Sequence, residues 1–367
     1  MSETLLLPPD AAGLEFDPLL PGAAVLSAHE QFVLPPAPPH LLGSDGMPRF
    51  GRFAGDLARL DWRGVHTSLL PGPLLRPLRH KRWRYLALCT DEVFCGIALV
   101  HLGWVSSAFA YVFEWDSARE IFAISREGLP LAARLSGAPF AGADCLFSAG
   151  GTQIRFAHQA GSQRYRLQVN TAQLQIDAEL DATDAAPALL AVGTVQHGAN
   201  TRRAHATQKS AAWAMRGELR LGARKIVLDG GVASLDYSCG SLARETSWRW
   251  ASAHARGIGF NLQQGYFGAQ ENALWLDGAL YPLGPAHFVF DPAQPGAPWR
   301  ISTEDGLLEL EFIPAGVRAQ NKNLGLAASR YFQPVGHFNG WVKPWPGAPA
   351  VAVRQLPGVT EDHFSRW

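Results

Sequence analysis

Polar and apolar residues alternate strictly in the stretch GTQIRFAHQAGSQRYRLQVNTAQLQIDAEL. Ile154 and Phe156 alternate with polar neighbours, and after the turn QAGS the pattern resumes at Tyr165 and Leu167 and again at Ile176. A period of two places successive side chains on opposite faces of a strand. The stretch therefore predicts three antiparallel strands with one apolar face and one solvated face.

A similar strand pattern extends over most of the chain from residue 82 onward. It consists of short aromatic or β-branched runs separated by turn residues. Asp-Gly pairs at 229–230, 277–278 and 305–306 are hairpin signals. One short candidate for a helix stands at residues 212–219, AWAMRGEL. Turn signals recur about every 8–12 residues, the spacing of sandwiches and barrels. The pattern predicts an all-β protein built of two similar halves.

The order of these segments predicts how the chain is divided. Residues 8–77 are rich in proline and glycine and are expected to wrap a surface as extended loop. The bland DATDAAPA segment suggests a boundary, with a first domain at 1–185, including the N-terminal segment, and a second at 186–367. The last residues, 361–367, are expected to dock as a tail through their aromatic side chains.

Composition narrows the class of protein. Hydrophobic residues make up 47% of the 367 residues, which is enough for a buried core. Lys and Arg equal Asp and Glu at 32 each, so no global field favours nucleic acid. No apolar run approaches the ~18 residues of an integral membrane segment, and the N-terminus lacks an export signal. With four scattered cysteines, we expect a soluble, cytoplasmic protein with reduced thiols.

Several chemistries have no motif in this sequence. There is no phosphate loop, no dinucleotide fingerprint between a strand and a helix, and no nucleophile elbow. The twelve histidines never form HxH or HExxH. We therefore predict neither a metal site nor a cofactor.

Five stretches of the chain resemble the bacterial domain-of-unknown-function family 2804. They are KRWRY (81–85), TQKSAAWAMRGELRLG (207–222), DYSCGSLARETSWRWASA (236–253), GFNLQQGYFGAQENALWLDGALYPLG (259–284) and LPGVTEDHFSRW (356–367). The resemblance implies a relationship to the lipocalin-like group that holds hydroxyneurosporene synthase (a carotenoid hydratase) and, more distantly, tocopherol cyclase and bacterial-fungal pericyclases. It implies two tandem lipocalin-like antiparallel β-barrels or sandwiches, apolar ligands, and reactions that need no redox cofactor.

A D-x3-G-x7-W-x-W pattern is formed by Asp236, Gly240, Trp248 and Trp250. It is similar to the acidic, tryptophan-containing motif of the carotenoid hydratases, although the histidine of that motif is absent here. A carboxylic acid buried among indoles has a raised pKa and can protonate an alkene, and tryptophan faces stabilise a cation. The alternative is structural: Asp236 would accept backbone N–H bonds in a turn, and the tryptophans would fill the core.

Further polar residues at strand-like positions are candidates for the same site. Glu245 and Glu271 are possible second carboxylates and Tyr237 a possible relay, with Asp236 as general acid or base. Candidate ligand-binding residues are Trp248, Trp250, Lys209, Asn261, Gln263, Glu271, Asn272 and His337. Each also has a structural interpretation, as a turn anchor or as a core residue.

Three functions remain open from the sequence. The first is a β-barrel protein that binds an apolar small molecule or lipid in its cavity. The second is a cofactor-independent hydratase, isomerase or cyclase acting on an apolar, isoprenoid-like substrate. The third is a structural or partner-binding protein with filled barrels. Neither the ligand nor the oligomeric state is encoded in a motif.

Overall fold

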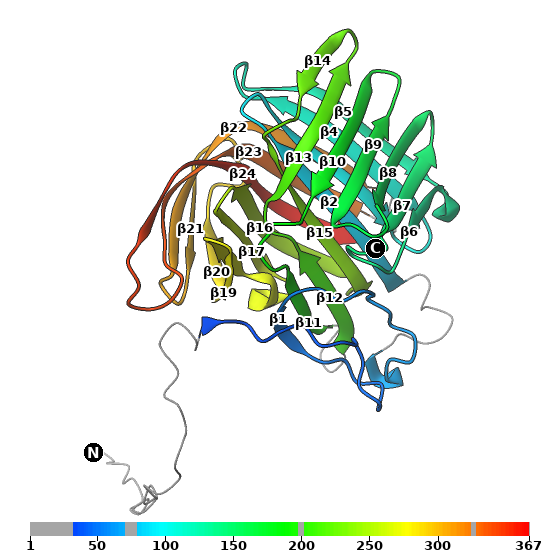
Figure 1. Ribbon diagram of the computed structural model, residues 1–367, viewed down its shortest axis with the longest axis vertical. Helices are drawn as coiled ribbons and strands as arrows, with labels where there is room; N and C mark the ends of the chain where they lie inside the picture. The colour runs from blue at the N-terminus through cyan, green and yellow to red at the C-terminus, as the bar shows by residue number, and fades with distance from the viewer. Residues whose placement is uncertain (1–31, 70–78, 197–201, 324–327, 367) are drawn as a thin grey trace, which may run out of the picture.

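The computed structural model of the chain describes residues 32–69, 79–196, 202–323 and 328–366. Strands account for 62% of residues and helices for 4%, which confirms the all-β prediction. The strands form two curled sheets, one a nearly closed barrel and the other a half-barrel. Figure 1 shows the first sheet in cyan and green and the second in yellow to red.

The first sheet follows the order β5-β4-β3-β2-β15-β13-β10-β9-β8-β7-β6, with β1, β11, β12 and β14 attached to it. Its strands are β1 (Gly51–Ala54), β2 (His80–Cys89), β3 (Val93–His101), β4 (Ser106–Glu114), β5 (Arg119–Gly128), β6 (Ala133–Leu135), β7 (Asp144–Ala149), β8 (Thr152–His158), β9 (Arg164–Asn170), β10 (Leu174–Asp181), β11 (Leu189–Gln196), β12 (Arg202–Lys209), β13 (Trp213–Leu221), β14 (Arg224–Val227) and β15 (Val232–Ser241).

The second sheet follows the order β19-β18-β17-β16-β24-β23-β22-β21-β20. Its strands are β16 (Glu245–Ala255), β17 (Ile258–Gly265), β18 (Ala273–Leu276), β19 (Ala279–Pro282), β20 (Ala286–Val289), β21 (Trp299–Thr303), β22 (Leu308–Asn323), β23 (Ala328–Val342) and β24 (Val351–Arg366). Three short 3-10 helices complete the described chain: η2 (Thr67–Leu69), η4 (Pro130–Ala132) and η5 (Gly268–Glu271).

Strand β15 occupies a special place in the first sheet. It pairs with β2 along its whole length. Its other edge is shared, because β13 pairs with Val232 and Ala233 whereas β12 pairs with the segment 236–240. Its side chains alternate between two environments, since Leu235 enters the core of the first sheet while Asp236 faces the second sheet.

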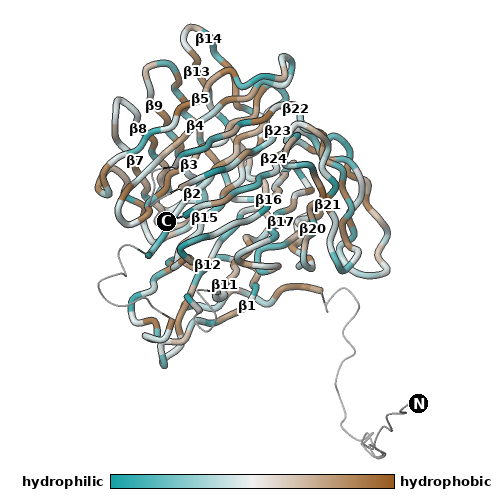
Figure 2. Tube along the Cα trace, turned by 180° about the vertical axis from the view of Figure 1, so that it is seen from behind, coloured by the Kyte–Doolittle hydropathy of each residue, from teal (hydrophilic) through white to brown (hydrophobic). Residues whose placement is uncertain are grey.

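Apolar side chains pack in three main layers. One core fills the first sheet around residues such as Phe147 and Leu167, and a second fills the half-barrel around Trp299 and Phe312. A third, aromatic cluster around Tyr111 lies between the two sheets. Figure 2 shows that apolar and polar segments are interleaved along the strands rather than gathered in a few elements. This alternation gives each sheet one face for its own core and another for its neighbour.

The predicted meander at 152–180 is confirmed as β8, β9 and β10, paired antiparallel. Asp277 and Gly278, both at positive φ, form the turn of the β18–β19 hairpin. The candidate helix at 212–219 is wrong, because these residues belong to strand β13. The predicted hairpin at 229–230 is also wrong: this turn joins β14 to β15, which both pair with β13 and not with each other.

The two ends of the chain differ from each other. Part of the N-terminal segment, residues 8–31 and 70–77, lies outside the described residues, and the part at 32–69 holds only β1 and η2. The C-terminal segment is not a docked tail but strand β24, which lies between β16 and β23 in the second sheet; Trp367 itself lies outside the described residues.

The two sheets meet at a different point from the predicted domain boundary. The first sheet continues beyond residue 186 through β11–β15, and the second begins with β16 at Glu245. The division of the chain into folding units at 185/186 stays a prediction. Within the described residues, no helix is long and apolar enough to cross a membrane.

Candidate functional site between the two sheets

A pocket of about 140 Å³ lies between the two sheets, which we call the inter-sheet pocket. The first sheet contributes side chains from β2, β3, β4, β12 and β15, and the second from β16, η5, β23 and β24. Its aromatic lining residues are Trp83, Tyr85, Phe109, Trp248, Trp250, Tyr266 and Tyr331, and its polar ones are Lys209, Asp236, Glu271, Gln333, Glu361 and His363. The pocket is thus an aromatic box with charged groups in its wall.

Lys209, Asp236 and Glu271 meet at this pocket, and we call them the Lys209 cluster. Lys209 at the end of β12 pairs in register with Asp236 on β15, so strand pairing alone brings the two together. The Lys209 Nζ lies 2.5 Å from Asp236 Oδ2 and 2.9 Å from Glu271 Oε2. Glu271 comes from η5, which follows the first hairpin of the second sheet. The two sheets therefore each supply one carboxylate to the same lysine.

Burial makes this arrangement electrostatically unusual. The side chains of Lys209 and Glu271 are each 4% exposed, and that of Asp236 is 13% exposed. Burial raises the pKa of Glu271, against the opposing effect of Lys209, and the neighbouring Asp236 raises it further. Burial alone would lower the pKa of Lys209, but Asp236 and Glu271 together raise it above its ordinary value. The lysine stays charged while Glu271 holds its proton more readily than a free carboxyl.

Two hydroxyl groups hold the second oxygen of Asp236. Thr207 Oγ1 lies 3.4 Å and Ser238 Oγ 3.3 Å from Asp236 Oδ1, and the Ser238 hydroxyl donates to Thr207 Oγ1 at 2.9 Å. Thr207 precedes Lys209 by two positions and Ser238 follows Asp236 by two, so all four side chains share one face. The carboxylate is oriented by its own strand and its neighbour.

A second polar group, the Glu361 cluster, comprises Glu361, Gln333 and His363. Trp248 Nε1 donates to Glu361 Oε1 at 2.9 Å, and Gln333 Nε2 donates to Glu361 Oε2 at 2.7 Å. His363 Nδ1 lies 3.1 Å from Glu361 Oε1, and its ring stacks on Trp248 with centroids 4.0 Å apart. Tyr111 donates to Gln333 Oε1 at 2.7 Å, which ties this cluster to the first sheet.

Trp250 and Asn261 connect the aromatic wall to the Lys209 cluster. The Trp250 indole donates to Asn261 Oδ1 at 2.8 Å, and Asn261 Nδ2 donates to the Glu271 carbonyl oxygen at 2.8 Å. Asn272 accepts from the Gln263 backbone N–H at 2.6 Å and donates to the Gly284 carbonyl at 2.9 Å. These two asparagines hold the turn that carries Glu271, so they position the carboxylate.

Two buried polar side chains near the pocket have no hydrogen-bond partner among the described residues. Both amide atoms of Gln263 and both ring nitrogens of His205 are in this state. Burial lowers the pKa of His205 to about 3, aided by Lys209, so this ring is neutral. His205 contacts the rings of Tyr266 and Phe267. Buried polar atoms of this kind usually bind a ligand or water.

Three of the predicted site residues lie elsewhere. Tyr237 points to the opposite face of β15 from Asp236, and its hydroxyl donates to the Ser136 carbonyl. Glu245 is 59% exposed and pairs with Arg366. His337 packs against Trp115, with ring centroids 4.6 Å apart, and does not line the pocket. None of the three faces the Lys209 cluster.

Other lining residues have no signal in the sequence. Glu361, Gln333 and His363 come from β23 and β24, which only long-range strand pairing brings beside β16. Tyr85 lies within KRWRY, and its side chain reaches the pocket because β2 pairs with β15. The strand alternation of β24 could have placed Glu361 and His363 on one face, had the strand been recognised.

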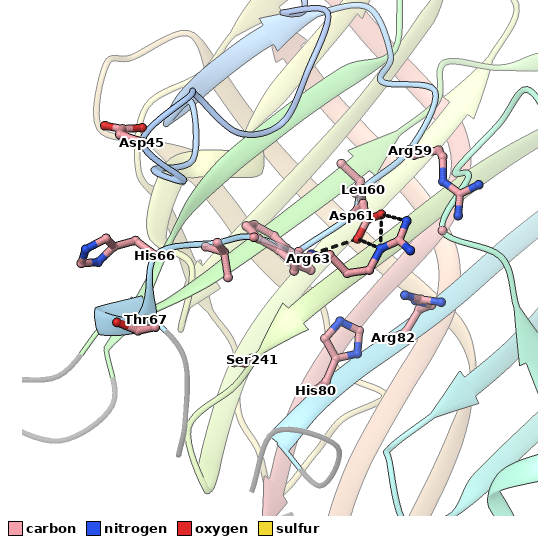
Figure 3. Close-up of a pocket in the computed structure, with 14 residues that line it drawn as sticks. Asp45, Arg59, Leu60, Asp61, Arg63, His66, Thr67, His80, Arg82 and Ser241 are labelled. Atoms are coloured by element: carbon pink, nitrogen blue, oxygen red, sulfur yellow. Dashed lines mark hydrogen bonds and ion pairs between the residues drawn. The ribbon is translucent and has the colours of Figure 1, made fainter. Parts of the chain in front are cut away.

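A larger hollow of about 980 Å³ lies at the start of β2 (Figure 3). It is lined by the segment before β2 and by His80 and Arg82. Figure 3 shows Arg63 turned onto Asp61, with which it forms an ion pair of 2.5 Å. His80 Nε2 lies 3.4 Å from the buried Cys239 Sγ. One ion pair joins two charged side chains of this hollow, whereas the inter-sheet pocket brings two carboxylates to one buried lysine, so the inter-sheet pocket is the better candidate for chemistry.

The sequence of the chain matches one protein family, the "Domain of unknown function (DUF2804)", over residues 35–367. The chain belongs to the DUF2804 family. This confirms the resemblance seen in the five sequence stretches. Among functionally curated proteins, none matches the sequence.

Several solved structures share the overall fold of this DUF2804 protein. Kievitone hydratase from Nectria haematococca superposes with a TM-score of 0.50 at 12% identity, covering 86% of this chain and 97% of that one. CghA, solved also with Sch210972, gives a TM-score of 0.51 at 10% identity over 90% and 97%. A structure described as AttH from Nitrosomonas europaea gives 0.50 at 15% over 78% and 92%. These similarities establish the fold that the DUF2804 chain shares with lipocalin-like barrel proteins.

Over the described ranges, no group of three or more His, Cys, Asp or Glu side chains is arranged to hold a metal ion. The polar groups of the inter-sheet pocket are instead carboxylates around a lysine and a carboxylate among neutral donors.

Proposed function

We propose that this protein is a cofactor-independent acid–base enzyme of the hydratase, isomerase or cyclase type, acting on a small, largely apolar molecule in the inter-sheet pocket. The observation that carries the proposal is the Lys209 cluster. Two carboxylates from different sheets share one buried lysine in the wall of an aromatic pocket. Perturbed, buried carboxyl groups in a pocket are typical of acid–base catalysis.

A simple carrier fits this arrangement less well. Binding an apolar molecule requires only an apolar cavity, whereas each buried ion costs several kcal/mol of desolvation that pairing only partly offsets. Lys209 and Glu271 are almost fully buried and lie at the wall rather than in a core. Burying a charged cluster at the wall of a cavity lowers the stability of the fold. Such a cluster is better explained by catalysis than by simple binding of a ligand.

The environments of the two carboxyls suggest different roles. Glu271 has a raised pKa and therefore supplies the proton. Asp236 is bound to Lys209 and receives two hydroxyl contacts through its other oxygen, so it acts as the base. Lys209 contacts both and links them. Asp236 was predicted as general acid or base; this assignment keeps the base role for Asp236 and gives the acid role to Glu271.

Hydration of an alkene illustrates the proton balance. Glu271 transfers its proton to one alkene carbon, and a water oxygen forms a bond to the other. Asp236 takes one proton from that water, leaving a hydroxyl on the substrate. Lys209 then passes a proton to Glu271 and takes the proton from Asp236, which restores the starting state. Dehydration runs the same steps in reverse, and isomerisation returns a proton from a second carbon in place of water.

The aromatic wall supports this chemistry in two ways. It excludes water from the acid, which strengthens electrostatic interactions in the pocket, and its π faces stabilise positive charge that develops on the substrate. The structural neighbour kievitone hydratase supports the proposal, because its name describes an enzyme that adds water.

Solvent labelling tests the proposal without a known substrate. The protein is incubated in deuterated water with an extract of small molecules, neutral and cationic, from the cells that produce it, and the extract is analysed by mass spectrometry. We expect at least one compound to gain carbon-bound deuterium. Glu271→Gln and Asp236→Asn should abolish the gain, because each removes one proton-carrying group.

Glu304→Gln is the matched control, because Glu304 is exposed and contacts only His287 at the surface of the second sheet. This variant should label the extract as the unaltered protein does. The proposal is contradicted if the unaltered protein labels no compound above a heat-inactivated sample, or if Glu271→Gln and Asp236→Asn label it equally well.

A further inference from the structure

The charges around the inter-sheet pocket do not balance. Its lining includes three carboxylates, those of Asp236, Glu271 and Glu361, and one lysine. Lys209 Nζ lies 2.5 Å from Asp236 Oδ2 and 2.9 Å from Glu271 Oε2, so it pairs with both of these carboxylates. Glu361 then remains as the carboxylate without a cationic partner of its own.

The surroundings of Glu361 confirm this reading of the charges. Trp248 and Gln333 donate to it from neutral N–H groups. No lysine or arginine within the described part of the chain forms an ion pair with Glu361. The His363 ring is the nearby basic group, with Nδ1 at 3.1 Å from Glu361 Oε1. The guanidinium of Arg318 does not line the pocket; it donates to the Tyr331 hydroxyl, faces the rings of Phe109 and Tyr111, and lies 3.9 Å from Glu120.

The aromatic lining of the pocket also attracts positive charge. Seven aromatic side chains surround the pocket, among them Trp83, Trp248 and Trp250. Their faces carry negative electrostatic potential, and tryptophan attracts cations most strongly. Aromatic cages with a nearby carboxylate are the common solution for recognising organic ammonium groups. An aromatic box that also holds an uncompensated carboxylate is built for positive charge.

We propose that the ligand of the inter-sheet pocket is an organic cation, a ring-sized molecule with a positively charged nitrogen that sits against Glu361 and the surrounding aromatic faces. The volume sets the size, because a cavity of about 150 Å³ accommodates benzene and this one is about 140 Å³. This inference rests on the proposed function, because both concern the inter-sheet pocket. It names the substrate class: the Lys209 cluster would act on carbon atoms of the organic cation.

A pair of probes with the same shape isolates the charge. N-methylpyridinium and toluene are both flat six-membered rings with one methyl group, and only the first is charged. Their binding is measured by isothermal titration calorimetry at about pH 8. We expect N-methylpyridinium to bind at least about tenfold more tightly than toluene, as cation–π contact and one partly desolvated carboxylate predict.

The Glu361→Gln variant tests the residue that carries the inference. It should bring the affinity ratio of the two probes close to one while toluene still binds, and retained toluene binding shows that the pocket is folded. Glu304→Gln, on an exposed carboxylate outside the pocket, should keep the ratio unchanged. Equal binding of the two probes to the unaltered protein, binding of neither probe, or a ratio that survives Glu361→Gln would each overturn the proposal.

The two proposals can fail separately. Glu271→Gln should bind N-methylpyridinium as the unaltered protein does, because Glu271 supplies a proton rather than the compensating charge. Loss of deuterium labelling with intact cation binding leaves the ligand class standing. Intact labelling without a preference for N-methylpyridinium leaves the acid–base function standing and removes the ligand class.

Discussion

Lys209 and Asp236 are cross-strand neighbours in the pairing of β12 with β15, and the same two residues form an ion pair of 2.5 Å. Opposite charges directly across an antiparallel pair stabilise it. Here the pair is also buried at the wall of a pocket and shared with a third residue, Glu271. The strand register therefore fixes the chemistry of the site as well as the sheet.

We expect Lys209→Met to destabilise the protein strongly. The substitution leaves two buried carboxyls without their cation, and breaking a buried ion pair in this way costs about 3–5 kcal/mol. Urea denaturation measures the loss. Lys225→Met is the control, because Lys225 pairs with Glu218 on the surface and should change little. Equal midpoints for the two variants would show that Lys209 is not compensating buried charge.

The raised pKa of Glu271 predicts a dependence of stability on pH. The unfolded chain releases this proton near 4.5, whereas the folded chain keeps it to higher pH, so the folded state binds more protons in between. The free energy of unfolding contributed by this group is therefore full below pH 4.5 and is lost as pH rises toward the folded pKa. Infrared spectroscopy should show the C=O band of a protonated carboxyl above pH 4.5.

Glu271→Gln removes one titrating group and should weaken both signals, leaving the part that comes from Asp56 and Glu120, whose pKa values are also raised by burial. Glu304→Gln, on an exposed carboxyl, should retain them. A wild-type carboxyl band that disappears entirely at or below pH 4.5 would contradict the raised pKa, and with it the role of Glu271 as the proton donor.

Acid should destabilise the protein through its buried histidines. The pKa of His205 is lowered by burial from 6.5 to about 3, and that of His254 likewise. Between these values the unfolded chain binds a proton that the folded chain does not, so stability falls as pH drops from 6.5 toward 3, by up to about 1.4 kcal/mol per pH unit for each histidine. Urea midpoints across this range measure the slope.

His205→Phe should remove about half of that slope, whereas His287→Gln, which changes an exposed histidine, should leave it unchanged. An unaltered slope in His205→Phe would mean that the ring accepts a proton in the folded protein.

Gly240 is the glycine of the D-x3-G motif, and its backbone predicts that no other residue fits. Its φ is +152°, and an added Cβ would lie 2.6 Å from the Ala204 carbonyl oxygen and 2.7 Å from the His205 Cα. Gly240→Ala should cost about 2–4 kcal/mol through strain and overpacking. Gly222→Ala, at φ +60° with nothing within 4 Å, should cost only about 1–2 kcal/mol. Thermal unfolding compares them, and equal losses would refute the close approach.

Local patterns were sufficient to predict the strands, because alternation and Asp-Gly turns act over a few residues. They also placed Asp236, Trp248 and Trp250 at one pocket, since these residues lie close in sequence. Tyr237 shows the limit of that reasoning: it adjoins Asp236, but a strand sends adjacent side chains to opposite faces.

The remaining part of the site depends on pairings between distant segments. Glu361 reaches Trp248 only because β24 lies beside β16, across more than a hundred residues of chain. Likewise the candidate helix at 212–219 became β13, because its partners β10 and β14 complete the first sheet and tertiary pairing overrides a weak local preference. No pattern within a single segment carries that information.

Asp236 and Glu271 come from different sheets yet share Lys209. Each sheet keeps its own apolar core, so a chain whose halves drifted apart would retain both cores and lose the site. For the proposed function, contact between the two sheets is then itself a condition for activity, and a weak interface would lower turnover in proportion to the time that the sheets spend apart. The proposed activity would belong to the interface between the sheets rather than to either sheet alone.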